Sequence, residues 1–370
     1  YPILAITGPR QSGKTTLLRE IFKEYEYLSL ENADLRERAI QDPNSFLLRY
    51  SGKVILDEVQ RAPQLFSYLQ TKTDLDREMG QYILSGSQNF LLLESITQSL
   101  AGRVALFKLM PFSFSEMQAG GLLANTWEEA CFQGFYPAIF DRQIHPIQFY
   151  PNYLETYLER DVRNLISVKD LSQFRLFIKR CAGNAGQLLN LQSLATDCGI
   201  SQPTAKSWLS VLESSYIVFL LPPYYKNFNK RIIKTPKLFF YDTGLICNLL
   251  EMDNPNDVDK YFQRGSLFEN FIIAEMHKQL LHLGRRPAFY FWQDANRNEI
   301  DLLWEKVSEI HCMEIKSGQT VSIDFFKNLY LFSSLSNSPN GKNYVAYGGD
   351  QQFTHQGVEV LNWQAVQNLM

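Results

Sequence analysis

Short apolar runs alternate with helical patterns in the N-terminal third of the chain. Residues 3–7, 53–56, 81–84 and 104–107 are apolar runs, and residues 16–22 have the apolar spacing of a helix. Strands of about four to eight apolar residues, bounded by polar turns and separated by helices, are typical of a parallel α/β sheet. The first part of the chain is therefore predicted to be an α/β domain.

A different pattern begins about halfway along the chain, where the predicted helices become short. Residues 191–198 are predicted to form one helix that ends at Gly199, and Ser201 is predicted to be the N-cap of the next helix. Two predicted strands, 216–221 and 237–241, follow and flank a loop. This order predicts a winged helix. The apolar residues of its second helix share one stripe: Ala205, Trp208, Leu209 and Leu212.

The C-terminal part combines strands and helices again. Its predicted elements, in chain order, are a helix around Glu269, strands at 288–292, 299–304 and 310–316, a helix near 324–335 and a strand at 344–347. The order is αβββαβ, which predicts a second α/β domain.

Length and composition bound the class of protein. A chain of 370 residues, 45% hydrophobic and 20% charged, is expected to be globular with about two or three domains. No run approaches the ~18 apolar residues of a membrane helix, so we expect no membrane partner. Five dispersed cysteines without a C-x-x-C pair favour a reducing, cytoplasmic setting over a structural zinc site. Because Tyr1 adjoins the first strand, we expect native N-terminal sequence to be missing.

The charge is distributed unevenly. Residues 171–240, here called the basic segment, hold nine lysines and arginines against two acids, a net +7, whereas the whole chain carries −3. This asymmetry predicts a face that binds a polyanion such as DNA, with an ordinary solvated surface as the alternative. Basic side chains can neutralise phosphates, and tyrosines can stack on unpaired bases. The loop of the predicted winged helix contains Tyr224, Tyr225, Lys226, Phe228, Lys230, Arg231 and Lys234.

A complete phosphate-binding loop lies between the first strand and the first helix. Its glycines let backbone N–H groups turn onto phosphate oxygens, and the helix N-terminus adds partial positive charge. Lys14 is expected to reach the β- and γ-phosphates of ATP, and the Thr15 hydroxyl to bind Mg²⁺. The expected nucleotide-binding residues are Gly8, Pro9, Arg10, Gln11, Ser12, Gly13, Lys14, Thr15 and Thr16.

Two acids end the second apolar run. Asp57 is expected to hold the Mg²⁺ shell, and Glu58 to orient and polarise the attacking water. Strand-terminal acids also serve as helix caps, but one intervening βα unit after the loop fits the nucleotide interpretation better. Arg103 opens a strand, where it either stabilises transition-state charge, in its own or a neighbouring subunit, or is structural.

These motifs resemble a known family when taken together. Gly-Pro-Arg-Gln-x-Gly-Lys-Thr-Thr, Leu-Asp-Glu-Val-Gln, Leu-Ser-Gly-Ser-Gln, Ala-Gly-Arg and the segment 111–116 occur in order, followed by Gly-Phe-Tyr-Pro at 134–137. The chain resembles the prokaryotic AAA-type ATPases whose C-terminal half is the domain of unknown function 4143. The resemblance implies a polar γ-phosphate contact after the third strand, for which we choose Ser87, with Gln88 second.

The C-terminal pattern resembles the PD-(D/E)XK nuclease core. Asp301, Glu314 and Lys316 match the motif positions, and Glu269 matches the helical acid. Residues 314 and 316 share one strand face, where Asp301 can join Glu314 in binding Mg²⁺. Lys316 would then position the metal-bound water. A scaffold that keeps these residues as ion pairs is the alternative.

The predicted domains are a P-loop AAA-type ATPase domain at 1–150, a helical and winged-helix domain at 151–245, and a nuclease-like domain at 246–370. The leading hypothesis is ATP hydrolysis coupled to DNA binding, with Mg²⁺-dependent DNA cleavage as an added activity. One alternative is an ATP-gated DNA- or protein-binding switch with a silent nuclease fold. Another is an ATPase that acts on a protein partner. A homo-oligomer is compatible with each.

Overall fold

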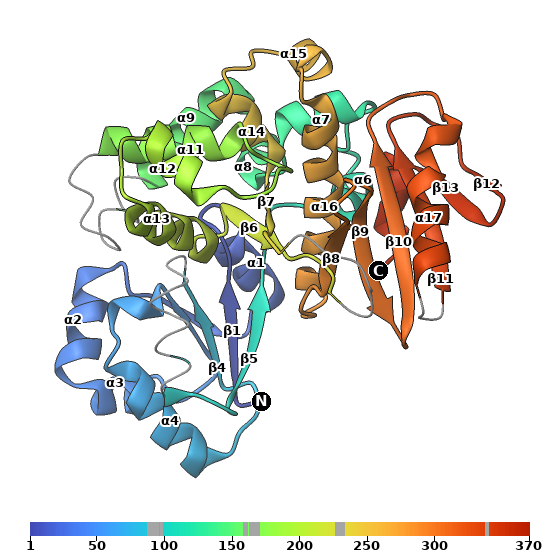
Figure 1. Cartoon of the computed structure of the whole chain (residues 1–370). Helices are drawn as coiled ribbons and strands as arrows, with labels where there is room; N and C mark the ends of the chain where they lie inside the picture. The colour runs from blue at the N-terminus through green and yellow to red at the C-terminus, as the bar shows by residue number, and fades with distance from the viewer. Residues whose placement is uncertain (87–95, 97–98, 158–161, 163–170, 226–233, 337–339) are drawn as a thin grey trace. The chain divides into compact units, whose positions relative to one another are not determined.

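The computed structural model describes residues 1–86, 96, 99–157, 162, 171–225, 234–336 and 340–370 (Figure 1). The chain divides into two compact units. The first comprises residues 1–111, 214–216 and 281–285, and the second comprises 112–213, 217–280 and 286–370. The predicted domain boundary at residue 150 thus falls inside the second unit, as does the one at 245.

A sheet of five parallel strands forms the first unit. Its order is β2 (Glu26–Ser29), β3 (Val54–Asp57), β4 (Tyr82–Ser85), β1 (Ile3–Thr7) and β5 (Val104–Lys108). Because every pair is parallel, the carboxyl ends of the strands meet at one edge. The strands predicted at 3–7, 53–56, 81–84 and 104–107 are present to within one residue. The short β2 was not predicted, because its four residues include Glu26 and Ser29.

Helices and buried apolar side chains stabilise this sheet. The strand residues Ile3, Val54, Leu56 and Leu84 are buried in one hydrophobic cluster together with Leu65 of a helix. Two helix starts are capped by the side chains of Asn32 and Asp42, which accept backbone N–H groups. The helices are α1 (Lys14–Ile21), α2 (Ala33–Gln41), α3 (Pro43–Arg49) and α4 (Leu65–Asp76), with a 3₁₀ turn at Val59–Arg61.

The described residues near the start of the second unit form four short helices, and residues 243–260 hold two more. Buried Asp242 caps α14 and accepts hydrogen bonds from the Tyr150 hydroxyl, at 2.6 Å, and from the Phe135 N–H, at 2.8 Å. The 134–137 motif is thereby attached to α14. These helices are α6 (Phe114–Ala119), α7 (Trp127–Gln133), α8 (Pro137–Asp141), α9 (Pro146–Tyr157), α14 (Thr243–Leu249) and α15 (Pro255–Lys260).

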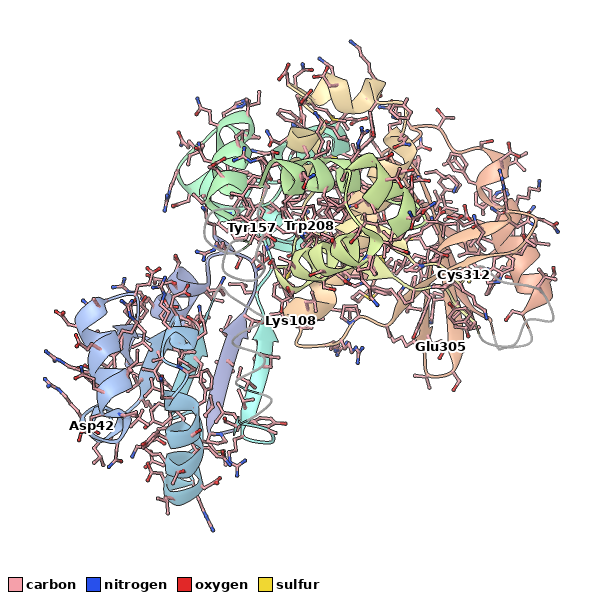
Figure 2. The ribbon with its side chains drawn as sticks, turned by 60° about the vertical axis from the view of Figure 1, so that its left-hand side comes forward. Asp42, Lys108, Tyr157, Trp208, Glu305 and Cys312 are labelled. Carbon is pink, nitrogen blue, oxygen red and sulfur yellow. The ribbon has the colours of Figure 1, made fainter. Side chains whose placement is uncertain are left out.

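Two helices and an antiparallel strand pair follow the order predicted for the middle of the chain, and a further helix, α11 (Leu171–Ala182), precedes them. The predicted elements are α12 (Leu191–Asp197), α13 (Gln202–Ser214), β6 (Val218–Leu221) and β7 (Lys237–Phe240). Leu188, before α12, forms an additional antiparallel bridge with Lys237. The predicted apolar stripe of α13 is buried, and it includes Trp208, which is labelled in Figure 2. The Trp208 ring packs edge-on against Phe174 and Phe177 of α11.

A six-stranded mixed sheet ends the second unit. The predicted order of a helix, three strands, a helix and a strand is present as α16 (Arg264–His282), β8 (Phe289–Gln293), β9 (Glu299–Lys306), β10 (Glu309–Lys316), α17 (Lys327–Leu335) and β11 (Asn340–Tyr347). β13 (Val358–Asn362) and β12 (Phe353–His355) extend the sheet beyond β11, and 3₁₀ turns lie at Ile323–Phe325 and Trp363–Asn368. Among the described residues, no helix has the length and apolarity needed to cross a bilayer.

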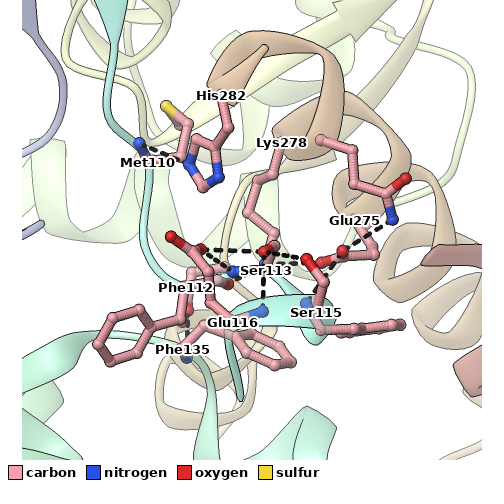
Figure 3. Close-up of polar contacts among 12 residues, drawn as sticks. Met110, Phe112, Ser113, Ser115, Glu116, Phe135, Glu275, Lys278 and His282 are labelled. Atoms are coloured by element: carbon pink, nitrogen blue, oxygen red, sulfur yellow. Dashed lines mark hydrogen bonds and ion pairs between the residues drawn. The ribbon is translucent and has the colours of Figure 1, made fainter. Parts of the chain in front are cut away.

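A buried ion pair on α16 holds the segment 112–116 in place (Figure 3). Glu275 and Lys278 are almost completely buried, 3.1 Å apart. Lys278 Nζ donates to the carbonyl of Phe112 at 2.6 Å, and Glu275 Oε1 accepts the N–H of Phe114 at 3.0 Å. Ser113 caps α6. The motif at 111–116 is therefore explained by a structural attachment to α16.

We expect Glu275→Ala to destabilise the second unit by about 3–5 kcal/mol, because it leaves the Lys278 ammonium buried without its carboxylate. Urea unfolding followed by tryptophan fluorescence measures the change. Glu359→Ala is the matched control, because it removes an acid from the exposed pair with Lys342 and should leave the transition in place. Equal transitions for the two variants would contradict the role given to Glu275.

Candidate functional site

The phosphate loop connects β1 to α1 at the carboxyl edge of the first sheet. Gly8 has φ +146°, and a Cβ there would lie 2.0 Å from the carbonyl oxygen of Leu109. Gly13, with φ +89°, is the N-cap of α1. Lys14 is buried, and its ammonium donates to the carbonyls of Gly8 at 3.0 Å and Pro9 at 2.6 Å. The ammonium is thus held at the loop that would bind phosphates.

The remaining loop residues have different environments. Gln11 has a left-handed backbone, with φ +59°. Ser12 is buried, and its hydroxyl finds no hydrogen-bond partner among the described residues. Arg10 is half-buried, and Thr16 is exposed in the first turn of α1. Exposure leaves the Thr16 hydroxyl accessible to a nucleotide.

Asp57 ends β3 and accepts four hydrogen bonds. Its Oδ2 accepts from the hydroxyls of Thr15 at 3.0 Å and Tyr27 at 2.5 Å, and its Oδ1 accepts from the Ser85 hydroxyl and the Glu58 N–H. Burial, together with the bond to Asp57, raises the pKa of Tyr27 well above its usual value. The carboxylate is therefore fixed beside Thr15, and the two residues offer the hard oxygen ligands that Mg²⁺ prefers.

Glu58 directly follows Asp57 at the same edge of the sheet. Its backbone is left-handed, with φ +53°, a conformation that non-glycine residues adopt mostly where the surrounding structure requires it. The half-buried carboxylate accepts a hydrogen bond from the Gln60 amide. This position beside the phosphate loop is suited to a base that orients water.

Ser85 and Tyr27 are site residues that the sequence analysis did not identify. Ser85 ends β4, which lies between β1 and β3, and it pairs in register with Asp57. The signal was available, because the apolar run 81–84 ends at Ser85. Tyr27 gave no signal, since its strand was not predicted. Ser87 and Gln88 lie outside the described residues.

Arg103 lies at the opposite edge of the sheet. Its carbonyl accepts the N–H of Ile3, at the start of β1, whereas the phosphate loop follows Thr7, at its end. Its guanidinium binds both carboxylate oxygens of Asp74 on α4, at 2.6 and 2.8 Å. Within its own subunit, Arg103 is therefore remote from the phosphate loop.

A second constellation lies in the C-terminal sheet. Lys316 on β10 contacts Asp301 Oδ2 at 3.0 Å and Glu314 Oε2 at 2.5 Å. Asp301 Oδ2 also accepts the N–H of Ile315 at 2.7 Å. The three residues of the nuclease-like motif are thus brought together, and Glu314 is almost fully buried.

Two unpredicted residues complete this constellation. The buried Lys237 ammonium contacts Glu269 Oε1 at 2.8 Å and also contacts Glu299. Oxygens of Glu269, Glu299 and Asp301 lie within 4.8 Å of one another. Glu299 precedes Asp301 by two positions and so shares its strand face, a spacing from which its place in this site could have been predicted. Lys237 comes from β7, and nothing in its local sequence indicates that it belongs to this site. We call this set the carboxylate cluster: Lys237, Glu269, Glu299, Asp301, Glu314 and Lys316.

Burial dominates the electrostatics of the carboxylate cluster. It raises the pKa of Glu269 and of Glu314 to about 8 each, and it raises the pKa of Glu299. Burial opposes the charged form of Lys237, but Glu269, Glu299 and Asp301 more than offset this and raise its pKa. The acids therefore resist full ionisation unless positive charge is close by.

The basic segment is partly neutralised by other elements. Arg175 pairs with Glu155, Lys179 pairs with Glu251, and Lys237 is buried in the carboxylate cluster. Arg180, Lys206 and Lys234 are exposed, as are the α13 residues Gln202 and Ser210. Lys226, Phe228, Lys230 and Arg231 lie outside the described residues.

The expected stacking role of Tyr224 is wrong. Its side chain is 3% exposed, packs in the core of the C-terminal sheet, and its hydroxyl donates to Glu305 at 2.7 Å. The loop after β6 pairs with β8 through Pro223 and Phe291, and this contact buries the ring. Tyr225 is exposed and can still contact a base.

Comparison with known proteins agrees with the geometry of the first unit. Residues 1–118 match the family described as AAA domain. The N-terminal part of this chain is therefore similar to AAA domains. After this segment, residues 124–256 and 264–366 match two families described as domains of unknown function, DUF8612 and DUF4143.

Relatives of this chain include proteins described as uncharacterized. One, Rv2008c of Mycobacterium tuberculosis, is 28% identical over 355 residues, which cover 95% of this chain and 78% of the relative. Another, from Haemophilus influenzae, is 22% identical over 351 residues, covering 85% of this chain and 82% of the relative.

Among solved structures, a Thermotoga maritima RuvB variant matches with a TM-score of 0.27 and 15% identity, over 60% of this chain and 82% of that chain. A Pyrococcus horikoshii signal transduction ATPase with numerous domains matches with a TM-score of 0.24 and 12% identity, over 75% of this chain and 45% of that chain. These scores support no conclusion about this chain.

We expect Gly8→Ala to weaken ATP binding by about tenfold or more, because the added Cβ strains the loop against Leu109. Titration with a fluorescent ATP analogue measures the affinity. Gly52→Ala, where a Cβ meets nothing within 4 Å, is the control and should bind as the wild type does. Equal affinity for both variants would show that the loop tolerates a side chain.

Proposed function

We propose that this chain hydrolyses ATP at the edge formed by β1, β3 and β4, and that its nucleotide state controls nucleic-acid binding by the basic segment. One observation supports ATP hydrolysis most strongly: the hydroxyls of Thr15, Tyr27 and Ser85 donate hydrogen bonds that fix the Asp57 carboxylate directly beside the phosphate loop. Thr15 and Asp57 fit Mg²⁺, which would neutralise charge on the phosphate oxygens.

Each residue of this edge has an assigned role in the proposal. Lys14 and the loop N–H groups bind the β- and γ-phosphates, and Glu58 accepts a proton from the attacking water and orients it. Ser85 holds Asp57, whereas Ser87, with Gln88 as second choice, remains our candidate for the γ-phosphate contact. Arg103 would act only across a homo-oligomer, on a neighbouring subunit's nucleotide.

We expect Glu58→Ala to lower ATP turnover by about 10²-fold or more while ATP binding is retained, because the water loses its base and the phosphate contacts remain. Phosphate release and analogue binding are measured on the same preparation. Glu31→Ala is the control, because it removes a half-exposed surface acid of the same unit. Unchanged ATP turnover in Glu58→Ala would show that Glu58 is not the base that activates the attacking water.

The nucleic-acid part rests on the second unit. The order of α11, the Leu188 bridge, α12, α13 and the β6–β7 pair supports the proposal of a winged helix, and with it a DNA-binding role. Lys206 lies on the exposed face of α13, and Lys234 lies in the loop before β7. With Gln202 and Ser210 as its neighbours on α13, Lys206 favours phosphate contacts over base readout.

We expect DNA affinity to differ between the ATP-bound and nucleotide-free protein, and to fall steeply with salt. Lys206→Ala with Lys234→Ala should reduce the logarithmic salt slope by about two, because each substitution removes one cation that neutralises a phosphate. Fluorescence anisotropy with a labelled duplex measures both effects. Lys342→Ala, an exposed lysine on β11, is the matched control. DNA binding without salt dependence, or none at all, would favour a protein partner.

A second function is favoured by the carboxylate cluster. Asp301, Glu314 and Lys316 meet on β9 and β10, within the helix, three strands, helix and strand of a nuclease-like core. Asp301 and Glu314 are oxygen donors suited to Mg²⁺, which would lower the pKa of a bound water. Lys316 would orient that water and stabilise charge on the phosphate. This arrangement supports metal-dependent phosphodiester cleavage.

We expect Glu314→Ala and Lys316→Ala to abolish any Mg²⁺- or Mn²⁺-dependent cutting of plasmid or single-stranded DNA, because each removes a member of the reacting set. Gel electrophoresis with and without ATP measures it, with Lys342→Ala as a control that should cut normally. Cutting that persists in both variants would place the activity elsewhere. Intact DNA in every lane would favour the switch with a silent nuclease fold.

A further inference from the structure

A lysine from outside the nuclease-like motif lies inside the carboxylate cluster. Lys237, the first residue of β7, is 4% exposed. Its ammonium contacts Glu269 of α16 at 2.8 Å and also contacts Glu299 of β9. A buried ammonium with two carboxylate partners occupies a place where a cation is strongly favoured.

The spacing of three carboxylates matches the shell of a divalent cation. Oxygens of Glu269, Glu299 and Asp301 lie within 4.8 Å of one another. Hard divalent ions bind oxygens at about 2.0–2.6 Å, so that opposite ligands are about 4–5 Å apart. Because the ammonium already contacts two of the three carboxylates, a metal ion and Lys237 cannot occupy this place together.

The charges of the cluster also favour a divalent ion. Lys316 forms ion pairs with Asp301 and Glu314. Lys237 forms ion pairs with Glu269 and Glu299, so two ammonium groups face four carboxylates. In addition, Glu314 Oε1 is buried and accepts no hydrogen bond from any described residue. Replacing the ammonium by a divalent cation would add one positive charge where acids are in excess.

We propose that Glu269, Glu299 and Asp301 form a site for Mg²⁺ or Mn²⁺, and that the Lys237 ammonium occupies this site in the resting protein. The inference rests on the second function proposed above and concerns its regulation. Glu299 thereby becomes a metal ligand that the nuclease-like motif does not include. Lys237 acts as an internal inhibitor that must leave before the metal binds.

The test measures Mn²⁺ binding to the nucleotide-free full-length chain by electron paramagnetic resonance. Lys237→Met removes the charge and keeps the side-chain length, so this variant should bind one Mn²⁺ at least about tenfold more tightly than the wild type. Lys237→Arg keeps the charge and should show no gain, and Lys342→Met controls for the loss of a lysine. Adding Glu299→Gln to Lys237→Met should abolish the gain.

Thermal unfolding gives a second readout, because Lys237→Met leaves two acids without their cation. At the same concentration, Mn²⁺ should raise the melting temperature of this variant more than that of the wild type. Equal Mn²⁺ affinity in the wild type and in Lys237→Met would overturn the proposal. So would a gain that survives Glu299→Gln.

Cleavage assays on the same proteins distinguish the two proposals. If Lys237→Met gains Mn²⁺ and leaves DNA intact, the cleavage function fails and the metal site stands. If the wild type binds Mn²⁺ as tightly as Lys237→Met and cuts DNA, the inhibitory role of Lys237 fails and cleavage stands.

Discussion

The need to pair buried charge determines the local structure of both candidate sites. A carboxylate or ammonium removed from water is stable only when hydrogen bonds and opposite charges surround it. Asp57 meets this requirement with four donors, which fix Thr15, Tyr27 and Ser85 around it. Lys278 and Glu275 meet it by binding the backbone of residues 112 and 114. The same requirement draws Lys237 into the C-terminal sheet.

The fold was predictable wherever a local pattern determines it. The phosphate loop, four of the five strands of the first sheet and the αβββαβ order follow from apolar periodicity and turn residues. Residues brought in by long-range pairing were not predictable in the same way. Lys237 contacts acids that lie 32 and 62 positions away, and neither its spacing nor its neighbours indicates this. Tyr224 shows the converse, because this loop residue is buried by the bridge that Pro223 forms with Phe291 of β8.

Charge counting along the sequence overestimated the basic face. Of the six basic residues of the basic segment that the structure describes, three are paired with acids from other elements, because ion pairing depends on tertiary structure and not on sequence distance. The exposed cations that the structure describes are few, which favours a backbone-directed contact of modest affinity.

Coupling between the nucleotide site and a nucleic-acid site can be measured directly. The experiment determines the Kd of a non-hydrolysable ATP analogue with and without saturating DNA. Coupling is reciprocal, so DNA must change the analogue's affinity by the same factor by which the analogue changes that of DNA. If the sites are coupled, the two factors are equal and differ from one. An analogue Kd that is identical with and without bound DNA would contradict the coupling.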